Sequence, residues 1–141
     1  MPASLTVLVR RVIRAPVERV FAAWTQPEHL RAWWGPGPVT CPEAIVDLRV
    51  GGAYAIANLM PDGRTSWIRG TFEVIDAPTK LVYSWGMDDT PARETVTVRF
   101  EERPGGTEVI VSHERIESEE ARVSHGIGWK LCLDGLDGFL Q

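Results

Sequence analysis

The feature that most limits the possible folds is a long alternation of apolar and polar residues, from residue 44 to residue 115, broken only by short turns. An alternation with a period of two is typical of strands that bury one face. It predicts six strands, at residues 44–50, 54–58, 67–75, 81–85, 94–101 and 107–115. Strands joined by short turns pair as an antiparallel meander, whose apolar face needs cover from the rest of the chain.

The segments before and after the meander can supply this cover. Residues 5–14 are mostly aliphatic or β-branched and predict one more strand. Pro16 stands where a helix begins, and Pro27 ends this helix and begins a second short one. Ser118, followed by two glutamates, begins a long final helix. We therefore expect one domain of 141 residues with an α+β fold: a curved antiparallel sheet of about seven strands, two short helices after the first strand, and a long C-terminal helix.

Composition restricts the partners and the location of the protein. The net charge is −4 and basic residues are interspersed with acidic ones, so we expect neither nucleic acid nor an anionic membrane surface as a partner. No apolar run approaches the roughly 20 residues of a membrane-spanning helix. The first residues do not show a positively charged segment followed by an apolar one and a cleavage site, the order that is typical of a signal peptide. Cys41 and Cys132 lie far apart, and we expect both to be reduced thiols in a cytoplasmic protein.

Short motifs along the whole chain can be compared with those of known families. They are Ala15-Pro16, Val20-Phe21, Ala23-Trp24-Thr25, Pro27-Glu28-His29-Leu30, Trp33-Trp34-Gly35, Asp47-Leu48, Gly51-Gly52, Pro61-Asp62-Gly63, Gly70, Leu81-Val82-Tyr83-Ser84-Trp85, Glu101, Gly105-Gly106-Thr107, His113, Ser118-Glu119-Glu120-Ala121-Arg122, His125 and Gly128-Trp129. With them, the chain resembles the START-like (SRPBCC) superfamily, specifically the homologues of the C-terminal domain of the Hsp90 ATPase activator. The resemblance implies a helix-grip fold. It implies no single activity, because this fold serves binding proteins, cyclases and co-chaperones alike.

Large aromatic residues are the main candidates for the wall of a pocket between the final helix and the sheet. Trp34, Tyr54, Trp85 and Trp129 fall on inward faces by their periodicity. We expect them to offer apolar surface to a small apolar or aromatic ligand. Trp33 should point about 100° away from Trp34 and so face elsewhere. Ordinary core packing would place large aromatic residues in the same way, and this alternative stays open.

Three polar side chains on the same faces are candidates for orienting the ligand. Asn58 shares a face with Tyr54, and a buried amide needs a hydrogen-bond partner in the protein, in water or in a ligand. His113 and His125 are the only ionisable residues that the pattern turns inward. They could bind a polar group of the ligand or transfer a proton. Hydrogen bonds to the backbone or to each other are the alternative.

We predict no cofactor and no metal ion. His113, His125 and Cys132 could imitate a zinc set, but the close spacing that such ligands usually have is missing. The chain also has no nucleophile elbow, phosphate-binding loop or dinucleotide fingerprint.

Three functional hypotheses follow from the residues and the resemblance. The first is a protein that binds a small apolar or aromatic molecule. The second is an enzyme of the cyclase or hydratase kind that uses His113 or His125 as a general base. The third is a module that contacts a chaperone, as the eukaryotic relative does. A homodimer is compatible with each of them.

Overall fold

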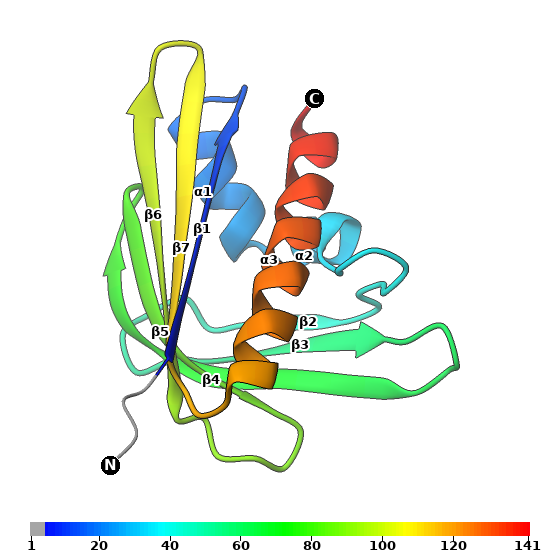
Figure 1. Ribbon diagram of the computed structural model, residues 1–141. Coiled ribbons are helices and arrows are strands. Elements are labelled where there is room, and N and C mark those ends of the chain that lie inside the picture. Colours follow the sequence, from blue (N-terminus) through cyan, green and yellow to red (C-terminus); the bar gives the residue numbers. More distant parts are fainter. Residues whose placement is uncertain (1–4) are drawn as a thin grey trace.

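The computed structural model describes residues 5–141. Within these residues, seven strands form one antiparallel sheet in the order β1-β7-β6-β5-β4-β3-β2, and three helices lie on its concave side (Figure 1). The elements are β1 (Leu5–Ile13), α1 (Val17–Thr25), α2 (Pro27–Trp33), β2 (Ala44–Val46), β3 (Ala53–Leu59), β4 (Thr65–Asp76), β5 (Lys80–Met87), β6 (Glu94–Arg103), β7 (Gly106–Ile116) and α3 (Glu119–Leu140). The predicted α+β architecture is confirmed, and β1 adds to the meander by pairing with β7.

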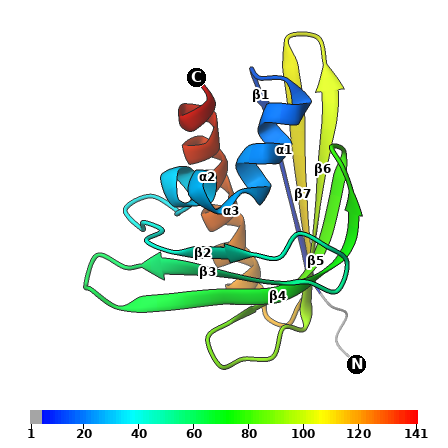
Figure 2. The ribbon, with the colours of Figure 1, turned by 180° about the vertical axis from the view of Figure 1, so that it is seen from behind.

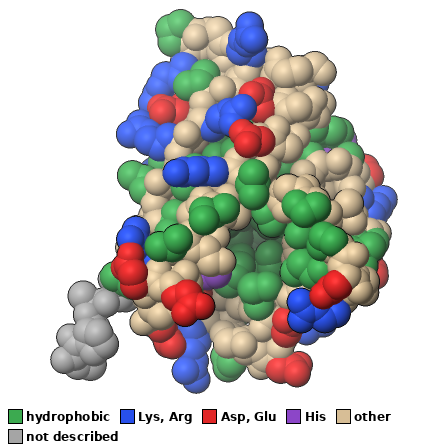
Figure 3. Space-filling model, turned by 45° about the vertical axis from the view of Figure 1, so that its right-hand side comes forward, with side chains coloured by type: hydrophobic (Ala, Val, Ile, Leu, Met, Phe, Trp, Pro, Cys, Tyr) green, Lys and Arg blue, Asp and Glu red, His purple; other side chains and the backbone are tan. Residues whose placement is uncertain are grey.

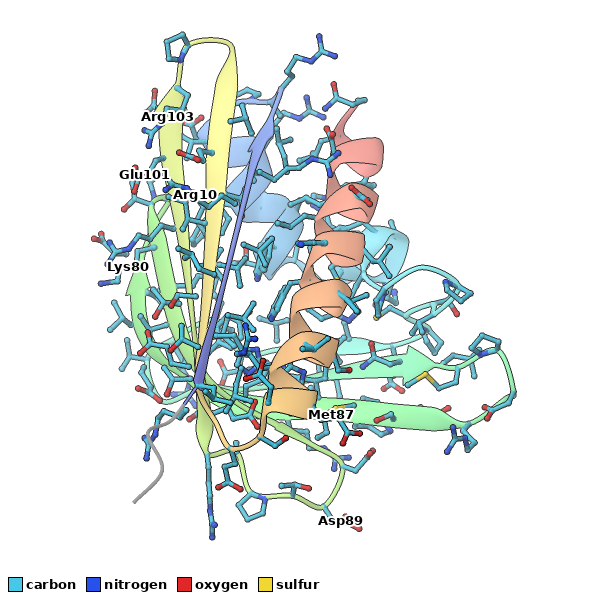
Figure 4. All side chains as sticks on the ribbon, viewed as in Figure 1. Arg10, Lys80, Met87, Asp89, Glu101 and Arg103 are labelled. Atoms are coloured by element: carbon cyan, nitrogen blue, oxygen red, sulfur yellow. The ribbon has the colours of Figure 1, made fainter. Side chains whose placement is uncertain are left out.

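The sheet is strongly curved and buries one face. Strands β6, β7 and β1 run steeply in Figure 1, whereas β3 and β4 run across the view, so the sheet wraps around α3. Alternate residues of β6 point inward as predicted: Val96, Val98 and Phe100 are at most 1% exposed. The convex face carries charges instead, among them Glu101 and Arg103, which form an ion pair at 2.7 Å (Figure 4).

The helices cover the concave face with apolar stripes. Pro27 is the first residue of α2, where its fixed φ suits a helix, and Pro16 is the residue immediately before α1 rather than its first residue. The Ser118 hydroxyl accepts a hydrogen bond from the backbone N–H of Ala121 and so caps α3. Figure 2 shows α2 near both α3 and β2, which it contacts. Among residues 5–141, no helix combines the length and apolarity that crossing a bilayer requires.

Three local predictions were wrong. Strand β2 ends at Val46 instead of residue 50, because the N–H of Arg49 bonds to the carbonyl of Asp47 and the chain turns at Gly51, whose φ is +85°. Trp34 lies just after α2 instead of on its apolar face. The helical spacing from His125 to Phe139 also predicts a buried Phe139 near the end of α3, but this residue is 37% exposed, because Leu140 takes the buried position.

Candidate functional site

A pocket of about 220 Å³ opens between the first half of α3, the loop after α2, and strands β3 to β5. In Figure 3 hydrophobic side chains surround the hollow. No Lys, Arg, Asp or Glu of the described chain lines it. The lining residues are Trp34, Pro36, Val39, Asn58, Met60, Ile68, Trp85, Met87, Ser124, His125, Gly128, Trp129 and Cys132.

One side of the pocket is a set of indoles held in fixed positions. The rings of Trp34 and Trp129 meet edge to face, with centroids 5.7 Å apart, and Trp24 stacks behind Trp129 at 6.0 Å. The indole N–H of Trp34 donates to Oδ1 of Asn58 at 2.9 Å. The amide N–H₂ of Asn58 donates in turn to the carbonyl of Ser66 at 3.3 Å. Asn58 therefore finds its partners within the protein and fixes the orientation of Trp34.

Next to this wall lies a buried histidine with a defined tautomer. Trp129 Nε1–H donates to Nδ1 of His113 at 3.0 Å, and an indole nitrogen can only donate. Nδ1 therefore carries a lone pair, and the ring proton of neutral His113 is on Nε2. This N–H donates to Oε1 of Glu94 at 2.6 Å. Burial, with a smaller contribution from His125, lowers the pKa of His113 to about 3, so His113 is neutral near pH 7.

Glu94 also contacts the second histidine. Nε2 of His125 lies 3.2 Å from the same Oε1 of Glu94, and the two imidazoles stack with centroids 4.6 Å apart. The Trp85 ring meets both imidazoles edge to face, at 4.8 and 4.9 Å. Burial lowers the pKa of His125, while burial and the nearby Glu117 raise the pKa of Glu94. The order of groups is thus Trp129, His113, Glu94, His125, with His125 at the pocket.

Glu94, His113 and His125 place three potential ligand atoms within 4.8 Å of one another, which raises the question of a metal ion. A metal on His113 would need the lone pair of Nε2, and the ring proton would move to Nδ1. There it would face the N–H of Trp129, donor against donor, whereas metal-binding histidines give their second N–H to an acceptor. The arrangement suits the two hydrogen bonds that link Trp129, His113 and Glu94 better than it suits a metal ion.

The structure brings five of the seven predicted site residues to the pocket: Trp34, Asn58, Trp85, His125 and Trp129. His113 is fully buried and does not line the pocket, but its ring contacts three residues that do: Trp85, His125 and Trp129. Tyr54 lies elsewhere in the core, where its hydroxyl donates to the carbonyl of Ser84 at 2.6 Å.

Glu94 is the residue that sequence reasoning missed. The prediction that His113 and His125 are the only ionisable residues turned inward was wrong, because the Glu94 side chain is just 23% exposed and contacts both imidazoles. A signal for it exists in the sequence: Glu94 has the same parity as Val96 and Val98, so the alternation that placed those valines inward also places Glu94 inward.

Comparisons with known proteins agree with this fold. Residues 14–141 match the family described as Activator of Hsp90 ATPase homolog 1-like protein. A crystal structure from Chromobacterium violaceum is similar with a TM-score of 0.87 and 26% identity, over 96% of each chain. The AHSA1-like protein of Aeromonas hydrophila has a TM-score of 0.81 and 27% identity, over 96% of this chain and 91% of that one. A protein of Arthrobacter aurescens has a TM-score of 0.81 and 28% identity, over 96% and 86%. Among proteins with curated descriptions, none matches the chain.

Proposed function

We propose that this chain, which belongs to the family of Activator of Hsp90 ATPase homolog 1-like proteins, binds a small, apolar, aromatic molecule. The molecule would occupy the pocket under the last helix of its helix-grip fold. The observation that carries the proposal is the uncharged pocket of about 220 Å³. An apolar cavity of about 150 Å³ can hold benzene, so this pocket suits one ring or two fused rings.

The lining supports an aromatic ligand in particular. Trp34, Trp85 and Trp129 offer ring faces and edges, and aromatic pairs gain about 0.5–1.5 kcal/mol beyond their buried area. Met60 and Met87 add thioethers, which adapt to irregular shapes and contact aromatic rings favourably. Such a wall selects for flat, polarisable molecules over flexible chains.

A pocket-filling variant tests the proposal. A Cβ at Gly128, which lines the pocket, would meet nothing within 4 Å, so Gly128→Leu begins its side chain in open space and takes up part of the hollow. Gly138 of the same helix is exposed and equally open, and Gly138→Leu is the matched control. The indole N–H signals of the protein can be followed by nuclear magnetic resonance during a titration with 2-methoxynaphthalene. We expect binding by the parent and by Gly138→Leu, and a loss of tenfold or more in Gly128→Leu. Equal affinity in all three proteins, or failure of the parent to bind either this ether or 2-naphthol, would end the proposal.

An enzyme of the cyclase or hydratase kind is a second candidate, favoured by the Glu94–His125 contact beside the pocket. His113 is poorly suited as its base, since Nδ1 accepts from Trp129 and Nε2 already carries a proton. The base would be His125. His125→Gln should then bind a substrate and not convert it, whereas His113→Gln would retain turnover if it folds. The third hypothesis, a chaperone contact, rests on the description of the family alone.

A further inference from the structure

We propose that the ligand of this pocket is a neutral aromatic molecule with a hydrogen-bond donor, such as a phenolic hydroxyl, which it gives to Nδ1 of His125. The proposal rests on the proposed binding function and adds the chemical class of the ligand. It follows from the proton positions in the chain of groups behind the pocket.

The first step concerns the tautomer of His125. Its Nε2 lies 3.2 Å from Oε1 of Glu94. A carboxylate oxygen only accepts, so a lone pair on Nε2 at that distance would be repelled and a proton there is attracted. Neutral His125 therefore carries its proton on Nε2, and Nδ1 holds the lone pair.

The second step explains why Glu94 imposes this tautomer. Oε1 of Glu94 is held by the Nε2–H of His113, whose own proton position is set by the donor Trp129. His113 is fully buried and cannot gain a second proton without placing N–H against N–H. The carboxylate oxygen thus stays an acceptor, and it favours a proton on Nε2 of His125 whether or not a ligand is bound.

The third step concerns access to Nδ1 of His125. No hydrogen bond from the described residues reaches this atom. It is also absent from the buried nitrogens that lack a partner, which are Nδ1 of His29 and Nε1 of Trp85. Since His125 lines the pocket and is partly exposed, its free acceptor is accessible to an incoming donor.

The last step excludes charged acids as ligands. No Lys or Arg of the described chain lines the pocket, so a carboxylate would lose its water without gaining a counter-charge. His125 offers no positive charge either, because burial lowers its pKa and keeps it neutral. Glu94 behind it would repel an anion. A neutral donor such as a phenol satisfies the site.

Three ligands of one scaffold test the proposal: 2-naphthol, 2-methoxynaphthalene and 2-naphthoate. The proteins are the parent, His125→Leu, and Ser124→Ala, which removes the neighbouring hydroxyl of the pocket lining as a matched control. Affinities are measured by the same titration of indole N–H signals. We expect the parent to bind 2-naphthol about tenfold more tightly than the methyl ether, the effect of one buried hydrogen bond, and to bind 2-naphthoate most weakly. The preference should vanish in His125→Leu, which still binds the ether, and persist in Ser124→Ala.

The outcomes separate the two proposals. Equal binding of naphthol and ether by the parent, or a preference that follows Ser124 instead of His125, would overturn the donor assignment while leaving the pocket as a binding site. Failure of every naphthalene to bind would remove both proposals. The nitrogen chemical shifts of His125 give a reading without any variant. Nδ1 should show the shift of an unprotonated nitrogen and move when 2-naphthol is added. A protonated Nδ1 would also overturn the donor assignment.

Discussion

The two halves of α3 pack against the rest of the molecule in opposite ways. In the second half, a Cβ at Gly135 would lie 2.7 Å from the carbonyl oxygen of Trp33, so helix and backbone touch there. In the first half, a Cβ at Gly128 would meet nothing within 4 Å. Both residues cost helix stability, but one allows close packing and the other leaves space. The comparison shows that one helix can pack tightly against backbone in one half and border an open pocket in the other.

The largest effect on stability should come from a side chain at Gly135, in the tightly packed second half of α3. We expect Gly135→Leu to lower the free energy of unfolding by about 3 kcal/mol, because the backbone of Trp33 cannot yield to the new atoms. Gly128→Leu should change it by about 1 kcal/mol or less, since it enters open space. Urea denaturation of both variants checks the contrast. Similar losses in the two would mean that the first half of the helix also packs tightly.

Lowering the pH should reduce the stability of the protein through the buried histidines beside the pocket. The unfolded chain protonates His113 near pH 6.5, whereas the folded protein does so only near pH 3. Between these values the unfolded state binds more protons, so stability is full above about pH 6.5 and falls as the pH falls. From His113 we expect a loss of about 2 kcal/mol between about pH 7.5 and pH 5, at about 1.4 kcal/mol per unit. His125, whose pKa is also lowered, adds in the same direction.

The matching variant is His113→Gln, with unfolding measured at both pH values. Its overall stability is expected to be lower, because the contacts to Trp129 and Glu94 are lost or weakened. Its dependence on pH in this range should nevertheless be flatter than that of the parent. An unchanged slope would show that His113 does not stay neutral in the folded protein.

Two neighbouring tryptophans, Trp33 and Trp34, are held by different kinds of hydrogen-bond acceptor. Trp33, at the packed end, gives its indole N–H to the backbone carbonyl of Ala23 at 2.8 Å. Trp34, at the pocket, depends on the side chain of Asn58. Asn58→Leu keeps the size of the residue but leaves the indole without an acceptor, and we expect a loss of about 1–2 kcal/mol together with weaker binding of naphthalenes. Unchanged stability and affinity would show that the Trp34 ring needs no such anchor.

The fold could be predicted from the sequence because its signals are local. A period of two defined the strands, and Pro27 and Ser118 marked helix starts that the structure confirms. The limits of β2 and the position of Phe139 were wrong because they depend on contacts between elements. Such contacts have no periodic signal.

The site was only partly predictable for the same reason. Strand and helix periodicity brought four aromatic residues and three polar ones inward, but it could not say that Tyr54 would lie away from the hollow. It could have identified Glu94, whose phase matches that of its valine neighbours. The direction of the hydrogen bonds from Trp129 through His113 to Glu94 follows from distances of 3.0 and 2.6 Å between separate elements. No sequence pattern encodes such distances.

The smallest effect sharpens the comparison most. Gly128→Ala adds one methyl group in open space and removes a helix-weakening glycine, so we expect stabilisation by up to about 1 kcal/mol. Gly138→Ala, exposed on the same helix, should stabilise by a similar amount. The two should differ in binding alone, because only the methyl at position 128 enters the pocket and reduces the affinity for 2-methoxynaphthalene. Thermal unfolding and the naphthalene titration measure both effects. A destabilised Gly128→Ala would mean that the helix lies on the sheet in solution, and the contrast between the two halves of α3 would disappear.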